Sequence, residues 1–361
     1  MKTQELWVDR RNLRKAELVE RDAPALADGE VRLAIDKFAL TANNITYALS
    51  GEILGYWRYF AAEGEWGKVP VWGFADVVES RCAGIEVGER IWGFLPMASE
   101  VVLTPGKLGP TQFFDFAPHR KALPSLYNLY YRTANDPPQL KALEDERCLM
   151  FPLFATSFIL YDYLIAHDYF GAEQILIGSA SSKTGYGLAW LLREDQKAKP
   201  RVIGMTSPAN LRFVEDLKIC DEVISYADIE RLDASKPVAF VDMAGSGPVI
   251  ASVHTHFGEN VKESCIVGAT HWDAERKRGT LPGAKPTMFF APAHIARREK
   301  EWGPGTVLPK TFGASTRIAQ AMAGRIDVVH LRGPQAVLQS YLAMLDNQVP
   351  PSRGLMLSMR D

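Results

Sequence analysis

The chain has 361 residues, with 41 Lys and Arg against 43 Asp and Glu, and 47% of the residues are apolar. This length suits about two domains, and the average apolar content excludes a disordered or fibrous protein. The formal net charge of −2 argues against nucleic acid or an anionic membrane surface as a partner.

Two further features argue against a membrane protein and a secreted one. The longest apolar stretch, 148–161, contains Pro152 and is shorter than the ~20 residues of a membrane-spanning helix, so we expect a core segment. The first residues contain no apolar signal region, and the four cysteines are dispersed without a C-x-x-C pair. We therefore expect a cytoplasmic protein.

Residues 1–150 are rich in short runs typical of β-strands. Turn residues separate these runs, which are 30–35, 69–73, 75–79 and 89–94. The pattern predicts a small, mostly antiparallel β-domain. Six prolines interrupt residues 105–146, which we expect to form an irregular excursion from this domain.

Residues 151–291 alternate β-type runs with helical patterns, which is typical of a parallel sheet covered by helices. The expected strands are 174–177, 201–205, 222–225, 238–242, 264–267 and 287–290, and the expected helices are 184–194, 209–218 and 248–257. Residues 292–361 are predicted to return to the β-domain, with helices at 315–323 and 333–346 and strands at 327–331 and 354–358.

A turn of small residues, 178–182, joins the strand at 174–177 to the helix that follows it. A helix N-terminus directs backbone N–H groups toward an anion, so the turn predicts phosphate binding; tight packing of strand on helix is an alternative of equal weight. The run Ser182-Lys183-Thr184 is similar to the end of a P-loop, but Ile177 and Ser182 stand where that motif has glycines. A nucleotide kinase or NTPase is therefore not expected.

Segments along nearly the whole chain resemble the medium-chain dehydrogenase/reductase superfamily, in particular its zinc-free quinone oxidoreductase and enoyl reductase branch. The matching segments, in order, are 28–31, 43–46 with Gly51, 87–94, 153–157, 221–226 and 354–357. Segments 56–60 and 71–75 are similar to an uncharacterised subgroup of that superfamily. The resemblance implies an α/β protein with a Rossmann-type nucleotide domain at 151–291 and a co-chaperonin-like, mostly antiparallel β-barrel domain.

The resemblance also implies that NADP(H) binds at the small-residue turn. Of the glycines in the superfamily's Gly-Ala-x-Gly-Gly-Val-Gly sequence only Gly185 remains, and Ser181, Ser182, Lys183 and Thr184 take aligned places. We expect the hydroxyls and the Lys183 ammonium to contact the pyrophosphate. The alternative is that Lys183 points to solvent and that nucleotide binding has been lost.

The end of the second strand of this domain favours NADP(H) over NAD. An NAD enzyme places a carboxylate there for the ribose hydroxyls, whereas this chain has Thr206 and Ser207, with Arg212 within reach of a 2′-phosphate. The alternative is a solvated Arg212. Four further residues are assigned to cofactor binding by the resemblance or by their place after a strand: Tyr226, Met243, Gly268 and Phe290.

No zinc site is expected. Zinc members of the superfamily have a Gly-His-Glu segment where this chain has Gly73-Phe74-Ala75, and four scattered cysteines do not form a structural zinc loop. His254 and His256 are two residues apart on a predicted helix, so they point in different directions and do not form a ligand pair.

The resemblance places the catalytic candidates mainly in the β-domain. Asn43, Tyr47 and Tyr56 lie where enoyl reductases of this branch have a catalytic tyrosine and quinone reductases have a polar lining. Tyr47 or Tyr56 is the expected proton donor, and packing of the aromatic run 56–60 in the core is the alternative. His271 follows the fifth strand, at the sheet edge where ligands bind, and is a secondary candidate for a general acid or a nicotinamide contact.

Together these features predict a zinc-independent, NADP(H)-dependent oxidoreductase that reduces a conjugated carbonyl or a quinone-like small molecule. One alternative is a dinucleotide-binding sensor or partner-binding protein without turnover, because the glycine turn is altered. Another is a carbonyl or alcohol dehydrogenase without a metal. The apolar run 287–291 indicates a homodimer that pairs sheets through the sixth strand, although a strand buried within one subunit has the same pattern.

Overall fold

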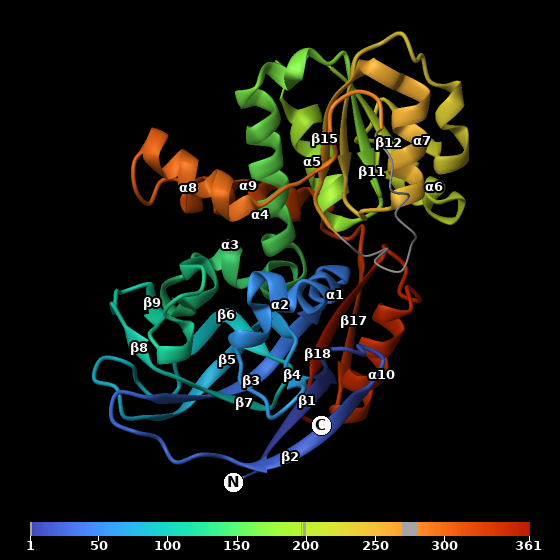
Figure 1. Ribbon diagram of the computed structural model, residues 1–361. Coiled ribbons are helices and arrows are strands. Elements are labelled where there is room, and N and C mark those ends of the chain that lie inside the picture. Colours follow the sequence, from blue (N-terminus) through green and yellow to red (C-terminus); the bar gives the residue numbers. More distant parts are fainter. Residues whose placement is uncertain (1, 196, 198–199, 269–280) are drawn as a thin grey trace. The chain divides into compact units, whose positions relative to one another are not determined.

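The chain folds into two units in the computed structural model, which describes residues 2–195, 197, 200–268 and 281–361 (Figure 1). The first unit comprises Met1–Leu149 and Ile326–Asp361, and the second comprises Met150–Arg325. Both ends of the chain therefore belong to the first unit.

The main sheet of the first unit has nine strands among the described residues, and most neighbours are antiparallel. Its path runs β17-β18-β3-β5-β6-β10-β9-β8, and β7 pairs with β3 beside that path. The strands are β3 (Val31–Leu40), β5 (Pro70–Ser80), β6 (Arg90–Pro96), β7 (Glu100–Leu103), β8 (Pro105–Gly106), β9 (Gln112–Asp115), β10 (Leu129–Arg132), β17 (Asp327–Arg332) and β18 (Arg353–Ser358). The predicted mostly antiparallel domain is confirmed, and β17 and β18, which pair in parallel, extend it from the C-terminal end of the chain.

A smaller sheet and several helices complete the first unit. The sheet has the order β2-β1-β4, with β1 (Lys2–Asp9), β2 (Ala16–Asp22) and β4 (Trp66–Gly67). The helices are α1 (Ala42–Leu49), α2 (Gly51–Leu54), α3 (Pro138–Lys141) and α10 (Pro334–Leu345). Helix α10 contacts β1, β2, β17 and β18, and Figure 1 shows it in red beside the last two. Its buried Tyr341 joins Leu6 and Phe38 in one apolar core, so burial of apolar surface joins the two ends of the chain.

The segment 105–146 is not the irregular excursion that the sequence predicts. Strands β8, β9 and β10 extend the main sheet beyond β6. The prolines interrupt the sequence pattern without preventing strand pairing, because they stand where no ladder hydrogen bond is needed. Pro105 lies in the edge strand β8, and Pro118 and Pro138 begin short helices.

The second unit contains a six-stranded sheet, all parallel among the described residues, in the order β13-β12-β11-β14-β15-β16. The strands are β11 (Gln174–Gly178), β12 (Arg201–Thr206), β13 (Glu222–Ser225), β14 (Val238–Asp242), β15 (Val261–Ile266) and β16 (Thr287–Met288). This is the 3-2-1-4-5-6 order of the Rossmann-type sheet, which confirms the predicted fold class. The sixth strand is shorter than the expected 287–290, because only Thr287 and Met288 pair with β15.

Six helices belong wholly or partly to the second unit: α4 (Glu144–Ala166), α5 (Lys183–Glu194), α6 (Leu211–Leu217), α7 (Gly247–Phe257), α8 (Ala291–Trp302) and α9 (Val307–Met322). The assignment of all residues 292–361 to the β-domain is wrong for α8 and α9, because α8 is bound to α4. The Asp162 Oδ2 atom accepts a hydrogen bond from Arg298 Nε at 2.6 Å and lies 2.7 Å from His294 Nε2. Figure 1 shows α8 and α9 beside α4, and the return to the first unit starts at Ile326.

Helix α4 is long and apolar enough to cross a membrane, but more than half of its most apolar window is buried in the protein. It therefore matches the core segment predicted at 148–161. The helix continues through Pro152, where the sequence pattern appeared interrupted. A proline removes one helical hydrogen bond, and packing of the buried Leu149, Phe151 and Phe154 offsets that loss.

The N-terminus of α4 is held to the main sheet of the first unit by an ion-pair network. Arg90 Nε and Nη2 donate to the two carboxylate oxygens of Glu144 at 2.7 and 2.8 Å, and Lys37 Nζ lies 2.9 Å from Glu144 Oε2. Burial disfavours the charged form of Glu144, but the hydrogen bonds from Arg90 and Lys37 outweigh it and lower the pKa of Glu144 to about 2.

We expect Glu144→Gln to reduce stability at neutral pH and to flatten the acid limb of the stability profile. The pKa of Glu144 is lower in the folded state than the ordinary value of about 4.3, so its contribution is complete above that value and is lost as the pH falls toward about 2. The loss in the free energy of unfolding at pH 7 should be about 2 to 3 kcal/mol, measured by urea denaturation. Glu146→Gln, on the same helical turn, is the control and should change little; equal acid profiles for the two variants would contradict this account.

Candidate cofactor turn and aromatic cluster

The turn between β11 and α5 has a backbone conformation that favours glycine, although a serine occupies it. Ser179 has a φ of +56°, in the left-handed region. Two hydrogen bonds hold this conformation: Ser182 N donates to Ser179 O at 2.9 Å, and Ser179 N donates to the hydroxyl of Tyr226 at 2.9 Å. A strained non-glycine residue of this kind persists only where its surroundings determine it. Tyr226, predicted to bind the cofactor, therefore contacts the turn itself.

Most hydroxyl groups of the turn are used within the protein. Ser182 is the N-cap of α5 and its Oγ accepts a hydrogen bond from Gly185 N at 3.1 Å. The buried Thr206, at the end of β12, donates its hydroxyl to Ser181 Oγ at 3.0 Å, and the Asn210 amide reaches the same oxygen at 3.5 Å. The hydrogen bond between Ser181 and Thr206 thus links the turn after β11 to the end of β12. The sequence did not identify Asn210 as part of this arrangement.

Helix α5 approaches the turn closely at Gly185. A Cβ atom there would lie 2.6 Å from Ser179 O and 3.0 Å from the Ser182 hydroxyl. These distances are shorter than van der Waals contact, so a side chain at this position would displace the turn. The one glycine that this chain keeps from the superfamily's turn sequence is the one that this packing requires.

The first turn of α5 has an N–H group and a cation that suit an anionic ligand. The backbone N–H of Thr184, at the second helical position, has no acceptor among the described residues. The neighbouring Lys183 is partly buried, and burial lowers its pKa to about 8. A helix N-terminus and a lysine at the carboxyl end of a parallel sheet are the groups that bind a phosphate in doubly wound folds.

The other predicted cofactor residues are spread along the carboxyl edge of the sheet. Met243 N donates to Gly178 O at 3.1 Å, so Met243 follows β14 directly beside the turn, and Gly268 is buried just after β15. Ser207 is partly buried after β12, whereas the Arg212 side chain on α6 is 93% exposed, 3.8 Å from Asp216. Phe290 is exposed before α8. His271 lies outside the described residues.

Asp242 is a further residue of this edge that the sequence analysis did not select. It ends β14, is buried, and accepts hydrogen bonds from Ala244 N and Ser246 N, both at 3.0 Å. It therefore shapes the loop that contains Met243. The sequence could have indicated this role, because Asp242 is a carboxylate at the end of an expected strand, shortly before a glycine.

In the first unit, Tyr47 and Tyr56 belong to an aromatic cluster. Their ring centroids are 4.4 Å apart, and Trp72, Phe94, Tyr59 and Tyr127 surround them. The Tyr56 and Tyr127 hydroxyls are 2.9 Å apart, Trp72 Nε1 donates to the Tyr47 hydroxyl at 3.5 Å, and Asn43 also hydrogen-bonds the Tyr47 side chain. The structure thus brings Asn43, Tyr47 and Tyr56 together, and the sequence missed Tyr127 because it lies in the proline-rich segment.

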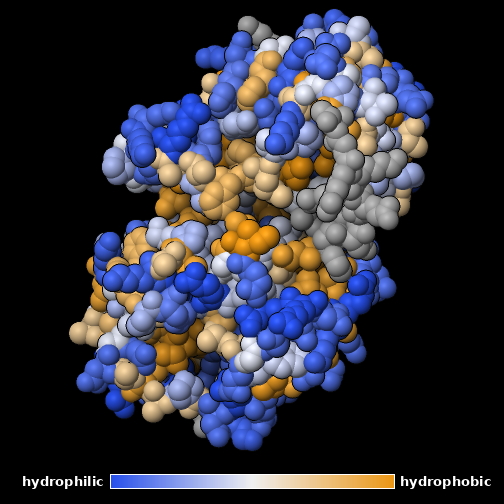
Figure 2. Space-filling view, in the orientation of Figure 1, coloured by the Kyte–Doolittle hydropathy of each residue, from blue (hydrophilic) through white to orange (hydrophobic). Residues whose placement is uncertain are grey.

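The phenols of this cluster are held in the protonated form. Burial is the main cause that raises the pKa values of Tyr47, Tyr56 and Tyr127. At neutral pH each hydroxyl therefore keeps its proton and can donate a hydrogen bond. Close to these residues, apolar side chains gather on the surface near α2, where Ile53 and Leu54 are exposed (Figure 2). Hydrogen-bond donors beside an apolar surface suit a carbonyl compound with an apolar body.

The described residues contain no group of three or more His, Cys, Asp and Glu side chains placed to hold a metal. Gly73, where zinc members have Gly-His-Glu, lies in β5, and a Cβ there would be 2.5 Å from Lys37 O. His254 is buried between Pro282 O and Ser264 Oγ, and His256 contacts Leu232 O. The two histidines thus have separate structural partners.

Solved structures with the same fold include reductases. The chain is similar to CurA from Vibrio vulnificus in complex with NADPH, with a TM-score of 0.62 and 14% identity over 99% of each chain. It is similar to a quinone oxidoreductase from Coxiella burnetii, with a TM-score of 0.51 and 12% identity over 100% of each chain. It is also similar to a mutant form of enoyl thioester reductase from Candida tropicalis, with a TM-score of 0.57 and 10% identity over 99% of this chain and 100% of that chain.

These solved structures have the same fold as this chain, which agrees with the Rossmann-type domain and the β-barrel domain that the sequence resemblance implies. Residues 38–350 match the family model described as "Protein of unknown function (DUF2855)", and the chain belongs to that family. No curated protein matches the chain.

We expect Gly185→Ala to destabilise the second unit by about 1 to 3 kcal/mol, because the added methyl group overpacks the turn at Ser179 O. Gly313→Ala is the matched control: Gly313 lies within α9, and an added methyl group there would have open space for 4 Å around it. That change should stabilise the protein by about 0.5 to 1 kcal/mol. Thermal unfolding of both variants measures these changes in stability. Equal stability of Gly185→Ala and the wild type would show that the close approach is not required.

Proposed function

We propose that the protein is an NADP(H)-dependent oxidoreductase that reduces a conjugated carbonyl or a quinone-like small molecule. The observation that supports this most is the turn between β11 and α5, where the Thr184 N–H and Lys183 stand at the carboxyl edge of a 3-2-1-4-5-6 parallel sheet. NADPH binding by CurA, which has the same fold, adds to this support. We further propose that the reaction needs no zinc, and that the protein is cytoplasmic and homodimeric.

The residues of the turn fit a dinucleotide phosphate. In this proposal the Thr184 N–H donates to the pyrophosphate and the Lys183 ammonium neutralises part of its charge. Arg212, whose side chain is almost fully exposed, binds the 2′-phosphate that distinguishes NADP(H) from NAD(H). Ser181, Ser182 and Thr206 act as positioning residues, because their hydroxyls maintain the turn and α5.

The bound cofactor would supply the hydride, and the β-domain would supply the proton. Tyr47 or Tyr56 is the proposed donor to the substrate oxygen or carbon. Because burial raises the pKa of both phenols, neither ionises at neutral pH, and the Tyr56–Tyr127 contact offers a neighbouring hydroxyl from which a proton can be replaced. Asn43, which hydrogen-bonds Tyr47, orients that phenol.

A dinucleotide-binding protein without turnover is the second candidate. It is favoured by the internal use of the Thr206 hydroxyl, which donates to Ser181 Oγ and so leaves one donor fewer for the cofactor than the predicted set. The two candidates differ in NADPH oxidation. Steady consumption of NADPH with an enone or a quinone excludes a protein without turnover. The product then identifies the reaction: a saturated C=C bond indicates the enoyl-type reaction, and an alcohol indicates carbonyl reduction.

The homodimer proposal rests on β16, the edge strand of the parallel sheet. Its residues Thr287 and Met288 are exposed, and the exposed Phe290 follows it. An exposed apolar edge strand can pair with a second copy. Sedimentation at several protein concentrations tests this proposal, and a monomer at all of them would overturn it.

Lys183 gives the cofactor proposal a pH signature. Because its pKa is about 8, the ammonium is charged below that pH and is neutral above it. We expect the affinity for NADPH, measured by fluorescence titration, to fall between about pH 7 and 9 as the ammonium loses its proton. Lys183→Gln should bind about tenfold more weakly at pH 7 and lose this pH dependence, whereas Lys183→Arg should keep its affinity across the range. If neither NADPH nor NADH binds below millimolar concentration, the proposal is wrong.

Removal of the proton donor should affect turnover and not binding. We expect Tyr47→Phe or Tyr56→Phe to lower kcat by about 100-fold or more, with the Kd of NADPH unchanged. Tyr59→Phe is the control within the same cluster, because the Tyr59 hydroxyl donates to Pro124 O and is assigned no proton transfer. If kcat stays within about twofold of the wild type in both variants, neither phenol is the donor.

A further inference from the structure

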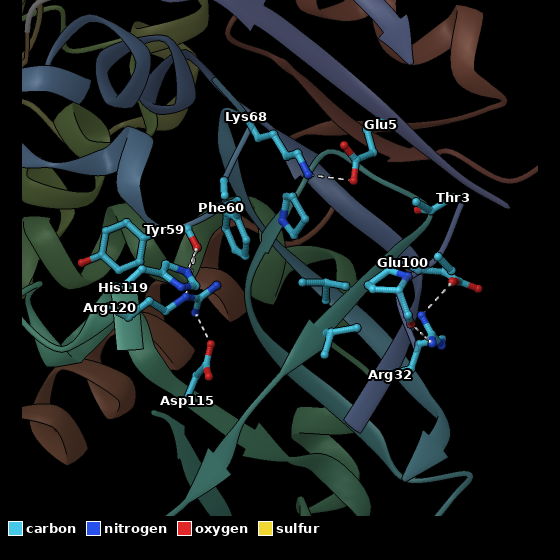
Figure 3. Close-up of a pocket in the computed structure, with 16 residues that line it drawn as sticks. Thr3, Glu5, Arg32, Tyr59, Phe60, Lys68, Glu100, Asp115, His119 and Arg120 are labelled. Atoms are coloured by element: carbon cyan, nitrogen blue, oxygen red, sulfur yellow. Dashed lines mark hydrogen bonds and ion pairs between the residues drawn. The ribbon is translucent and has the colours of Figure 1, made fainter. Parts of the chain in front are cut away.

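The first unit contains a cavity of about 360 Å³ that the proposed reaction does not use (Figure 3). Its polar lining comes from several strands, with Glu5 on β1, Arg32 on β3, Glu100 on β7 and Asp115 on β9. Apolar lining residues include Pro24, Phe60, Pro96 and Val101. This volume is within the range of small-molecule pockets, and Figure 3 shows the charged groups placed around it.

Two of the acidic residues that line the cavity have close cationic partners. Lys68 Nζ lies 2.7 Å from Glu5 Oε1, and Trp7 Nε1 donates to Glu5 Oε2 at 2.6 Å, so both oxygens of Glu5 have partners. Arg120 Nη1 lies 2.9 Å from Asp115 Oδ2, and both side chains are buried. These pairs form opposite parts of the wall in Figure 3.

Asp115 Oδ2 and Glu100 Oε2 are both buried oxygens without a hydrogen bond, but the charged partner of Glu100 is much farther away. Glu100 is 8% exposed, and its Oε2 atom accepts no hydrogen bond from any described residue. The nearest charged nitrogen, Arg32 Nη1, is 3.8 Å away, and Arg32 donates instead to Glu79 Oε2 at 3.2 Å and to Pro24 O at 2.6 Å. A buried acceptor without a hydrogen bond is destabilising, and a ligand with an N–H or O–H group at this position would recover that loss.

The carboxylates and the Lys and Arg side chains that line the cavity are equal in number, but they are not all closely paired. The cations are Arg32, Lys68 and Arg120, and the anions are Glu5, Glu100 and Asp115. Arg32 also pairs with Glu79, which lies outside the lining, and its nearest approach to Glu100 is 3.8 Å. A hydrogen bond from a cation to a carboxylate is stronger than one from a neutral group, so a cationic donor suits Glu100 Oε2 better than a neutral one.

We propose that this cavity binds a small amphiphilic amine. Its ammonium group donates to Glu100 Oε2, and its apolar body lies against Phe60, Pro24 and Pro96. This inference is independent of the cofactor turn, because every lining residue belongs to the first unit. The two proposals can therefore fail separately.

Isothermal titration of the full chain at pH 7 with 2-phenylethylamine tests the proposal. We expect saturable binding of this amine, at least about tenfold weaker binding of the neutral analogue 2-phenylethanol, and no binding of the anionic 3-phenylpropionate. Equal binding of the alcohol would overturn the assignment of a cation. Preferential binding of the carboxylate, or no binding of any of the three at millimolar concentration, would overturn the site.

Three variants locate the binding within the chain. Glu100→Gln should weaken amine binding by about tenfold or more, since it removes the charged acceptor. Glu79→Gln removes the other carboxylate on Arg32 but lies outside the cavity lining, and should weaken binding less than Glu100→Gln. Ala61→Trp, at an exposed lining position, should block the cavity without disturbing the core. Amine binding by Glu100→Gln or by Ala61→Trp at wild-type affinity would contradict the proposal, and thermal unfolding of each variant shows that it is folded.

Discussion

The close approach of α5 to the end of β11 determines the geometry of the proposed cofactor site. The absence of a side chain at Gly185 lets the helix start directly against Ser179 O. The left-handed Ser179 then turns the chain, Tyr226 accepts its N–H, and Ser182 caps the helix. The first helical N–H groups consequently face the carboxyl edge of the sheet, where doubly wound proteins bind phosphates.

The departures from the superfamily's turn sequence have a physical explanation in this arrangement. Ser182 replaces a glycine and Ser181 stands at the variable position, and both hydroxyl oxygens accept internal hydrogen bonds, from Gly185 N and from Thr206. Side-chain hydrogen bonds therefore stabilise the turn of this chain. The proposed phosphate contacts are made by the Thr184 N–H and by Lys183, whose pKa burial lowers to about 8.

The fold could be predicted from the sequence largely because its signals are local. Alternating runs in 174–267 predicted five of the six parallel strands, and the small-residue turn was placed correctly between β11 and α5. Two errors came from non-local effects. Strands β9 and β10 pair despite the prolines around them, and α8 belongs to the second unit because Asp162, far away in sequence, binds His294 and Arg298.

The site was predictable only in part. Tyr47 and Tyr56 were found through the resemblance, but their partner Tyr127 joins them only through the folding of a segment with no regular pattern. Likewise, Thr206 has a polar side chain that the sequence assigns to a ligand, whereas the fold buries it and bonds it to Ser181. Which polar groups face a ligand depends on burial, and single-residue identity does not specify burial.

A crystal structure of the protein grown with saturating NADPH tests the central claim most directly. The account predicts the pyrophosphate within hydrogen-bond distance of the Thr184 N–H, with Lys183 beside it and the 2′-phosphate near Arg212. A nucleotide bound elsewhere, or no nucleotide at the β11–α5 turn, would contradict it.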